Sequence, residues 1–352
     1  MSTTSSLAPD TVADIDVTAQ IDDILGLPEQ LRDALWRVES AALRPHDSPS
    51  GMVVAGVGGS SIGGALARAV LGDRASRPIV LARGYELPSW TTPETTVLCT
   101  SYSGNTEETL ALYEAAQALG AHTVVMTTGG QLASQARADG VPVIPVPGGF
   151  QPRAAVAYAL VVALEVAALC GAGEQLHSEV DVAAARAEDL VAAWGPDAPD
   201  TSLAKTIARG LHGTIPQIAG AELTAPIAYR WKTQINENAK TPAFSAELPE
   251  LDHNELVGWE NARAIAAFSA VFLDDSDLHP RVRQRIELTR GLIASRGGVT
   301  FRVESIGHTR LERLVSLVLL GDLVSLYLAV LRSIDPAPVE VIESLKAALA
   351  GG

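Results

Sequence analysis

The chain has 352 residues, a length typical of about two domains. It carries 26 basic against 41 acidic side chains, a formal net charge of −15. Such an acidic chain is a poor partner for nucleic acid or for an anionic membrane surface, because both are bound largely through positive charge. Hydrophobic residues make up 47 % and aromatic residues 5 % of the chain, which excludes global disorder and favours α/β packing over an all-β sandwich.

The first segment, residues 1–50, has apolar residues at helical spacing over 11–45, so we predict a helical lead-in there. Its start has neither the basic stretch nor the apolar core of a secretory signal. Cys99 and Cys170 lie in apolar runs and form no CxxC pair, which indicates buried thiols in a reducing cytoplasm. The seven histidines show no HExxH or HxH spacing, so we expect no metal site.

Short apolar runs alternate with helical patterns over residues 51–170. This alternation is typical of a doubly wound parallel sheet, and we predict an α/β fold for this segment. The expected strands are 52–56, 78–82, 96–100, 122–127 and 141–146, and the expected helices include 65–71, 107–119 and 150–169.

The same rhythm returns over residues 201–335, after a connecting segment at 171–200 that contains an expected helix at 182–194. A duplicated α/β subdomain is therefore indicated, followed by a short C-terminal helix in 336–352. Two long apolar runs are interrupted by Glu165 and Asp322, which favours buried core helices over membrane spans. In this half we expect strands at 214–220, 264–274 and 298–303, and helices at 224–239, 280–295, 310–332 and 339–349.

Two loops rich in serine and glycine, 56–64 and 101–106, each join a predicted buried strand to a helix. Helix N-termini present unpaired backbone N–H groups and favour anions, glycine lets the backbone approach a ligand, and hydroxyls add donors without charge. We interpret the pair as a phosphate site without lysine, suited to a small phosphorylated metabolite. Its hydroxyls would be those of Ser60, Ser101, Ser103 and Thr106.

Other readings of these loops stay open. A dinucleotide fingerprint fits poorly, because Ser61 stands at its third glycine position and Arg83, not an acid, ends the next predicted strand. The Walker pattern is absent, whereas Gly59–Gly63 fits GxSxG and would make Ser61 an esterase nucleophile. The glycines could also serve only tight turns, although two such loops make that explanation weaker.

The candidate acid and base groups lie outside these loops. Glu237 stands among amides at the end of a predicted helix, and His253 follows sixteen residues later within Asp-His-Asn-Glu. A carboxylate and a histidine are a common pair for proton transfer near neutral pH. Taken alone, each has a simpler structural explanation, a helix end for Glu237 and a turn for His253. Arg153 places a positive charge at the start of a predicted apolar helix, where the helix dipole favours negative charge. Lys346, taken alone, is a surface lysine on a short helix.

These motifs together resemble the sugar isomerase (SIS) fold and, more narrowly, the bifunctional phosphoglucose/phosphomannose isomerase family. The resemblance runs from about residue 50 to the C-terminus. The Ser-Tyr-Ser-Gly-Asn-Thr loop is found in SIS domains generally, while Asn-Glu-Asn with Asp-His-Asn-Glu and a terminal lysine helix is narrower. The residues that carry it are Gly58–Ser60, Ser101–Thr106, Pro152–Arg153, Asn236–Asn238, Asp252–Glu255, and the tail from Asp335 to Lys346.

The resemblance implies a reversible aldose–ketose isomerisation of a hexose 6-phosphate without metal or other cofactor. It implies that Glu237 moves a proton between C1 and C2, that Arg153 stabilises the enediolate, and that His253 and Lys346 open the sugar ring. It also implies a homodimer in which His253 comes from the neighbouring subunit. The phosphate would be held by Gly58, Gly59, Ser60, Ser101, Ser103 and Thr106.

One departure concerns Ala337, which stands where many members of the family have threonine. Because that position bears on the second C2 epimer, the mannose activity is less secure than the glucose activity. A non-catalytic sugar-phosphate sensor on the same fold and an isomerase of another phosphosugar remain alternatives. An amidotransferase is disfavoured, since residue 2 is serine and not a cysteine nucleophile.

Overall fold

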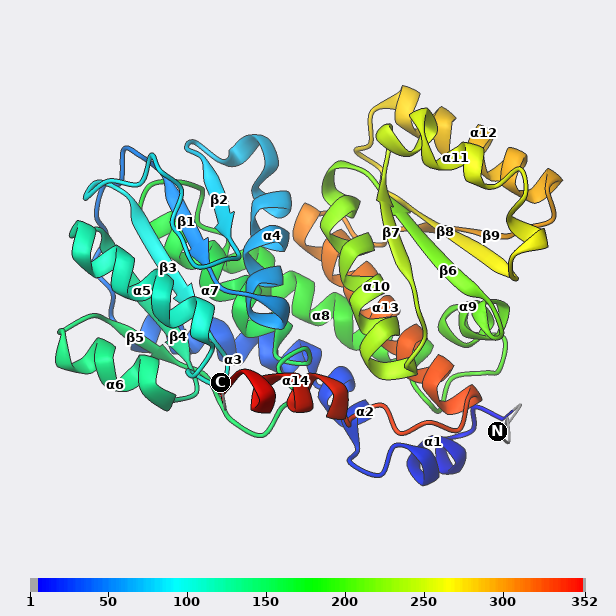
Figure 1. Cartoon of the computed structure of the whole chain (residues 1–352), viewed down its shortest axis with the longest axis horizontal. Coiled ribbons are helices and arrows are strands. Elements are labelled where there is room, and N and C mark those ends of the chain that lie inside the picture. Colours follow the sequence, from blue (N-terminus) through cyan, green and yellow to red (C-terminus); the bar gives the residue numbers. More distant parts are fainter. Residues whose placement is uncertain (1–5, 351–352) are drawn as a thin grey trace.

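The computed structural model describes residues 6–350 and contains two parallel sheets (Figure 1). The first has the strand order β2-β1-β3-β4-β5 and the second the order β7-β6-β8-β9, with every neighbouring pair parallel. The first order is that of flavodoxin-like doubly wound folds, and the second repeats its first four positions. The predicted fold class, two doubly wound α/β subdomains, is confirmed.

All strands except β7 fall on the apolar runs of the sequence. They are β1 (Met52–Ala55), β2 (Ile79–Ala82), β3 (Thr96–Thr100), β4 (His122–Thr127), β5 (Val143–Pro145), β6 (Ile215–Gly220), β7 (Phe244–Glu247), β8 (Phe268–Asp274) and β9 (Val299–Glu304). The longer helices are α3 (Leu27–Ser40), α4 (Gly58–Leu71), α5 (Glu107–Leu119), α6 (Gly130–Ala138), α7 (Val156–Leu169), α8 (His177–Trp194), α9 (Leu203–Leu211), α10 (Ala225–Ala239), α12 (Pro280–Ser295), α13 (Arg310–Leu331) and α14 (Glu340–Ala350). Short helices are α1 (Pro9–Ile15), α2 (Gln20–Leu25), α11 (Glu255–Gly258), η1 (Gly72–Arg74), η2 (Glu222–Thr224), η3 (Glu250–His253) and η4 (Ala262–Ala264).

Helices fill the space between the two sheets. α4 packs on α7, α10 packs on α13, and α8 packs on α13, so one apolar core runs through both halves (Figure 1). The predicted helical lead-in is confirmed as α1, α2 and α3, and α3 packs against α7 and α8. The division of the chain into segments 1–50, 51–170, 171–200, 201–335 and 336–352 remains a prediction.

The expected loop at 56–64 is wrong beyond Val57, because α4 already begins at Gly58. Its glycines serve close packing of the helix. A Cβ on Gly63 would overlap the backbone of Ala159 in α7, and one on Gly64 would lie 2.8 Å from Val54 in β1. The glycine-rich stretch is therefore a helix pressed between a strand and a neighbouring helix.

Three further boundaries differ from the sequence prediction. α7 begins only at Val156, so Arg153 lies in the turn before it, and β8 begins at Phe268 rather than at 264. The helix expected at 182–194 is longer and starts at His177. The strand β7 was missed, because it is short, lies at a sheet edge and stands between Pro242 and Pro249, where proline is tolerated.

The charges that interrupt the apolar runs are buried and paired, Asp322 with a buried arginine and Glu165 with a half-buried histidine. The Asp322 carboxylate in α13 lies 2.6 Å from the Arg230 guanidinium, and the Glu165 carboxylate in α7 lies 2.6 Å from His177 Nε2. α13 is long and apolar enough to cross a membrane, but its most apolar window is completely buried inside the fold. The two thiols, Cys99 and Cys170, are free and buried, as predicted.

Candidate active site

The predicted phosphate loops lie at the carboxyl edge of the first sheet. β1 leads into α4 and β3 leads into α5, and because β1 and β3 are parallel neighbours both helices begin at the same edge. The N–H groups of the first turns, together with the hydroxyls of this edge, form a setting suited to an anion. The structure thus brings Ser60 together with the loop that carries Ser101, Ser103 and Thr106.

Hydrogen bonds hold the two loops to each other. The Tyr102 N–H donates to Ser60 Oγ at 3.0 Å, and Thr100 Oγ1 donates to the Ser60 carbonyl at 3.2 Å. Ser101 Oγ accepts from the Gly104 N–H at 3.0 Å and lies 2.8 Å from Thr106 Oγ1. The two loops are therefore tied together by their own hydrogen bonds.

Ser61, the alternative esterase nucleophile, has only 3 % of its surface exposed. It lies within the first turns of α4. A nucleophile elbow requires an exposed serine hydroxyl, so this arrangement disfavours the hydrolase reading.

Gly59 joins the phosphate loops to the turn that holds Arg153. A Cβ at this position would lie 2.9 Å from the Pro152 carbonyl oxygen and 3.1 Å from the Arg153 nitrogen. Only glycine permits the start of α4 to approach this backbone so closely. The phosphate loops and Arg153 therefore belong to one rigid assembly.

The Arg153 guanidinium is almost completely buried, with 4 % of the side chain exposed, and it joins four parts of the chain. Its partners come from α2, from the end of α10, from its own turn and from the tail that follows α13. They are Asn238 Oδ1 (2.7 Å), Gln20 Oε1 (2.8 Å), the Pro336 carbonyl (2.8 Å), the Ala337 carbonyl (3.2 Å), Gln151 Oε1 (3.3 Å) and the Glu237 carboxylate (3.5 Å). The lead-in helices thus contribute directly to this site.

A second buried layer supports Arg153 from behind. Arg230 donates to the backbone carbonyl of Arg153 at 3.0 Å and to Asp322 at 2.6 Å, and Gln234 donates to the other oxygen of Asp322 at 2.9 Å. Burial lowers the pKa of Arg153, although the nearby Glu237 carboxylate opposes the shift, and burial raises the pKa of Asp322. The turn that carries Arg153 is consequently fixed on both sides.

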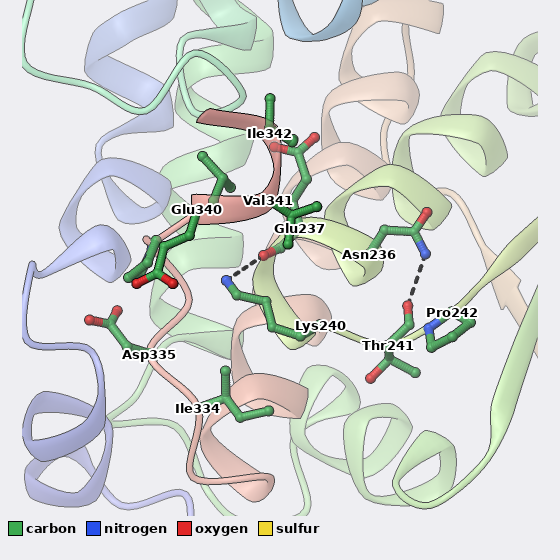
Figure 2. A pocket seen from close by; sticks show the side chains of 12 residues that line it. Asn236, Glu237, Lys240, Thr241, Pro242, Ile334, Asp335, Glu340, Val341 and Ile342 are labelled. Carbon is green, nitrogen blue, oxygen red and sulfur yellow. Dashed lines mark hydrogen bonds between the residues drawn. The ribbon is translucent and has the colours of Figure 1, made fainter. Parts of the chain in front are cut away.

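Glu237 faces a cavity of about 710 Å³ that lies between the end of α10, the tail and the first turn of α14 (Figure 2). The Glu237 side chain is 32 % exposed, so it is accessible to a substrate while paired with Arg153. The phosphate-loop residues are not among those that line this cavity; they connect to it through Pro152 and Arg153. The lining residues are Asn236, Glu237, Lys240, Thr241, Pro242, Ile334, Asp335 and Pro338–Ile342.

Two of the predicted site residues are not brought to Glu237 within one chain. His253 is exposed on η3, which follows β7 at the carboxyl edge of the second sheet, whereas Glu237 ends α10 at the opposite edge. Lys346 is exposed on α14, and among the described residues no hydrogen bond or ion pair connects it to the site.

The sequence reasoning missed several contributors to the site. Gln20 gave no signal, since a lone glutamine in an amphipathic segment is unremarkable, and Lys240 looked like an ordinary helix-end lysine. Asp322 was noticed only as an interruption of an apolar run. Within residues 6–350, no group of three or more His, Cys, Asp or Glu side chains is arranged to hold a metal ion.

Comparison with known proteins shows the family and the fold to which the chain is similar. Residues 200–349 match the model of the bacterial phospho-glucose isomerase C-terminal SIS domain. A bifunctional phosphoglucose/phosphomannose isomerase from Caldicellulosiruptor bescii is 39 % identical over 94 % of this chain and 98 % of its own length. One of the same name from Aquifex aeolicus is 36 % identical over 88 % and 93 %. The fold is shared with a hypothetical protein from Thermus thermophilus, at a TM-score of 0.72 with 16 % identity over 97 % of this chain and 94 % of that one.

The two parallel sheets, with Ser/Gly loops at the carboxyl edge of the first, place the chain in the class of proteins built from two sugar isomerase (SIS) domains. The relatives from Caldicellulosiruptor bescii and Aquifex aeolicus match most of the chain and define a narrower group within this class. The chain belongs to the bifunctional phosphoglucose/phosphomannose isomerase family.

Proposed function

We propose that the chain interconverts glucose 6-phosphate and mannose 6-phosphate with fructose 6-phosphate, as the names of its relatives indicate for those proteins. One observation carries the proposal in the structure. The Glu237 carboxylate and the Arg153 guanidinium lie 3.5 Å apart at a cavity, and the phosphate loops adjoin Arg153 through Gly59. A carboxylate base beside a fixed cation is what a reaction through an enediolate requires.

In the proposed reaction Glu237 removes the proton at C2 of the open-chain aldose and returns it at C1, while the hydroxyl proton moves from O2 to O1. The enediolate formed between these steps carries negative charge, which the Arg153 guanidinium stabilises from a buried and fixed position. The phosphate lies on Gly58, Gly59, Ser60, Ser101, Ser103 and Thr106, where two helix N-termini and several hydroxyls meet. His253 and Lys346 transfer the protons that open the ring.

Ala337 bears on which C2 epimer is accepted. The residue is buried, and its backbone carbonyl accepts from Arg153 Nη2 at 3.2 Å. The position therefore takes part in the site through its backbone, whatever its side chain. We infer that both epimers are substrates and that alanine in place of threonine alters their ratio.

The direct test is a coupled assay of the purified protein with EDTA present. The reaction is followed from fructose 6-phosphate to glucose 6-phosphate and, separately, from mannose 6-phosphate to fructose 6-phosphate. Turnover of both supports the dual isomerase, and turnover of glucose 6-phosphate alone restricts it to one epimer. Thermal stabilisation by these sugar phosphates without turnover would instead favour a sensor.

We also propose that the protein acts in the cytoplasm, as a metabolic enzyme.

The separation of His253 from Glu237 within one chain supports a homodimer in which each site takes His253 from the partner. We expect His253→Ala and Glu237→Gln proteins to be inactive alone and to recover activity when their subunits are mixed and exchanged. In a mixed dimer with shared sites, one site has both groups intact. Activity of the mixture is measured after exchange has been verified with differently tagged subunits; a mixture that exchanges but stays inactive would contradict the shared site.

A further inference from the structure

Lys240 follows the last residue of α10, three positions after Glu237, and takes the left-handed backbone conformation with φ of +48°. Glycine or asparagine usually occupies such a position, because a side chain makes this conformation unfavourable. Lysine is also scarce here, since only four of the 26 basic residues are lysines. A lysine at this strained helix end therefore calls for an explanation.

The turn of the backbone lets the Lys240 side chain fold back over the helix end. Its Nζ donates to the carbonyl of Glu237 at 2.6 Å (Figure 2). It also donates to the carbonyl of Pro336 at 2.8 Å. The Pro336 carbonyl also accepts from Arg153 Nη2 at 2.8 Å. Two cations thus converge on a single carbonyl oxygen of the tail.

That oxygen belongs to the segment Asp335–Pro338, which leads from α13 into α14. The same segment supplies Asp335 and Pro338 to the wall of the cavity that Glu237 faces. A displacement of the tail would change both the shape of this cavity and the Arg153 contacts to Pro336 and Ala337.

We propose that Lys240 is a positioning residue for the isomerisation, whose ammonium clamps the tail at Pro336 to the backbone of Glu237 and so fixes the catalytic carboxylate and its cavity. This inference rests on the proposed function. Lys240 touches no reacting atom in it, and the effect on turnover passes through Glu237 and the tail.

The charge of this ammonium depends on pH in an accessible range. Burial of the amino group, with the nearby Arg153 charge, lowers the pKa of Lys240 from about 10.5 to about 8, against the opposing influence of Asp335 and Glu237. The charged groups that face it are Arg153 before α7, Glu237 on α10, Asp335 in the tail, and Glu340 of α14 across the cavity. When the Lys240 ammonium loses its proton, it has one N–H fewer and no positive charge with which to bind the carbonyls of Glu237 and Pro336.

Loss of the Lys240 proton should weaken the clamp, so we expect kcat to fall as the pH rises through about 8. The effect of the same titration on stability has the opposite sign. The pKa of Lys240 is lower in the folded than in the unfolded protein, so between about pH 8 and 10.5 the unfolded state binds more protons. The contribution of this group to the free energy of unfolding therefore rises with pH. An activity that falls across pH 8 cannot come from unfolding through Lys240.

The test compares pH profiles of kcat and KM for the wild type, Lys240→Met, Lys240→Arg and a control, Lys232→Met. Lys232 lies on the same helix, with its Nζ over the Tyr229 ring at 4.9 Å, and makes none of the tail contacts. We expect Lys240→Met to lower kcat by about 10- to 100-fold, since a small misplacement of a reacting group can cost about 100-fold. Lys240→Arg should retain kcat and lose the alkaline fall near pH 8, because arginine stays charged.

The proposal is overturned if Lys240→Met keeps both the wild-type kcat and the fall near pH 8. A second readout needs no turnover: hydrogen exchange over residues 333–339 should be faster in Lys240→Met than in the wild type or Lys232→Met. Unchanged exchange would show that the clamp does not hold the tail. If the wild type converts neither sugar phosphate, the proposed function fails, while the exchange experiment still decides whether Lys240 secures the tail.

Discussion

Replacing Glu237 by glutamine should lower kcat by about 10²- to 10⁴-fold, the usual loss on removing a positioned acid–base group. Glutamine keeps the shape of the side chain and can still lie beside Arg153, 3.5 Å away, but it cannot accept the C2 proton. Binding of the sugar phosphate should persist, since the phosphate loops lie at a different sheet edge. Steady-state kinetics combined with calorimetric titration of fructose 6-phosphate measures both effects.

A matched control is Glu340→Gln, which removes another carboxylate from the same cavity. Glu340 is not among the partners of Arg153, so its loss should reduce kcat far less than the loss of Glu237. If the Glu237→Gln protein kept more than about a tenth of the wild-type rate, a loss too small for an acid–base group, Glu237 would not be the base. Equal losses in the two variants would point instead to the total charge of the cavity.

The α/β architecture was readable from the sequence because parallel strands buried on both faces are continuous apolar runs. The predicted ranges for β3 and β4, and for α5 and α12, agree with the structure at both ends. Two errors share one cause, which is that glycine and proline commonly mark breaks in regular structure. At Gly63 and Gly64 the glycines permit helix packing, and near Pro242 and Pro249 the prolines flank an edge strand.

The site was only partly predictable for a different reason. Glu237 and Arg153 stand 84 positions apart. The residue types suggested acid–base chemistry for Glu237 and an unusual positive charge at a helix start for Arg153, without joining the two. Their assembly was implied by family resemblance, and the structure places them in contact. Gln20 lies in a segment that had no expected role, yet its amide oxygen accepts from Arg153 and its amide nitrogen donates to Asn238. Such contacts depend on tertiary packing and leave no local pattern.

Replacing Arg153 by lysine should lower kcat by about 10²- to 10³-fold, the typical effect of removing a donor aimed at developing charge in a buried site. Lysine keeps the positive charge, but its single ammonium cannot reproduce a planar guanidinium that serves α2, α10 and the tail at once. The kcat of Arg153→Met should fall at least as far as that of Arg153→Lys. The Arg153→Met protein should also lose about 1–3 kcal/mol of unfolding free energy, the penalty for leaving a buried acceptor such as Gln20 Oε1 without its donor.

The two substitutions separate the catalytic role of Arg153 from its structural role. Turnover is measured below the lowest melting temperature of the set, and urea unfolding supplies the stability of each variant. Gln20→Leu serves as the control, because it removes one acceptor at 2.8 Å from Arg153 while leaving the guanidinium beside Glu237. It should cost stability with a smaller loss of kcat than Arg153→Lys. Wild-type turnover in Arg153→Lys would show that charge alone suffices, whereas near-normal turnover in a folded Arg153→Met protein would remove Arg153 from the stabilisation of the enediolate altogether.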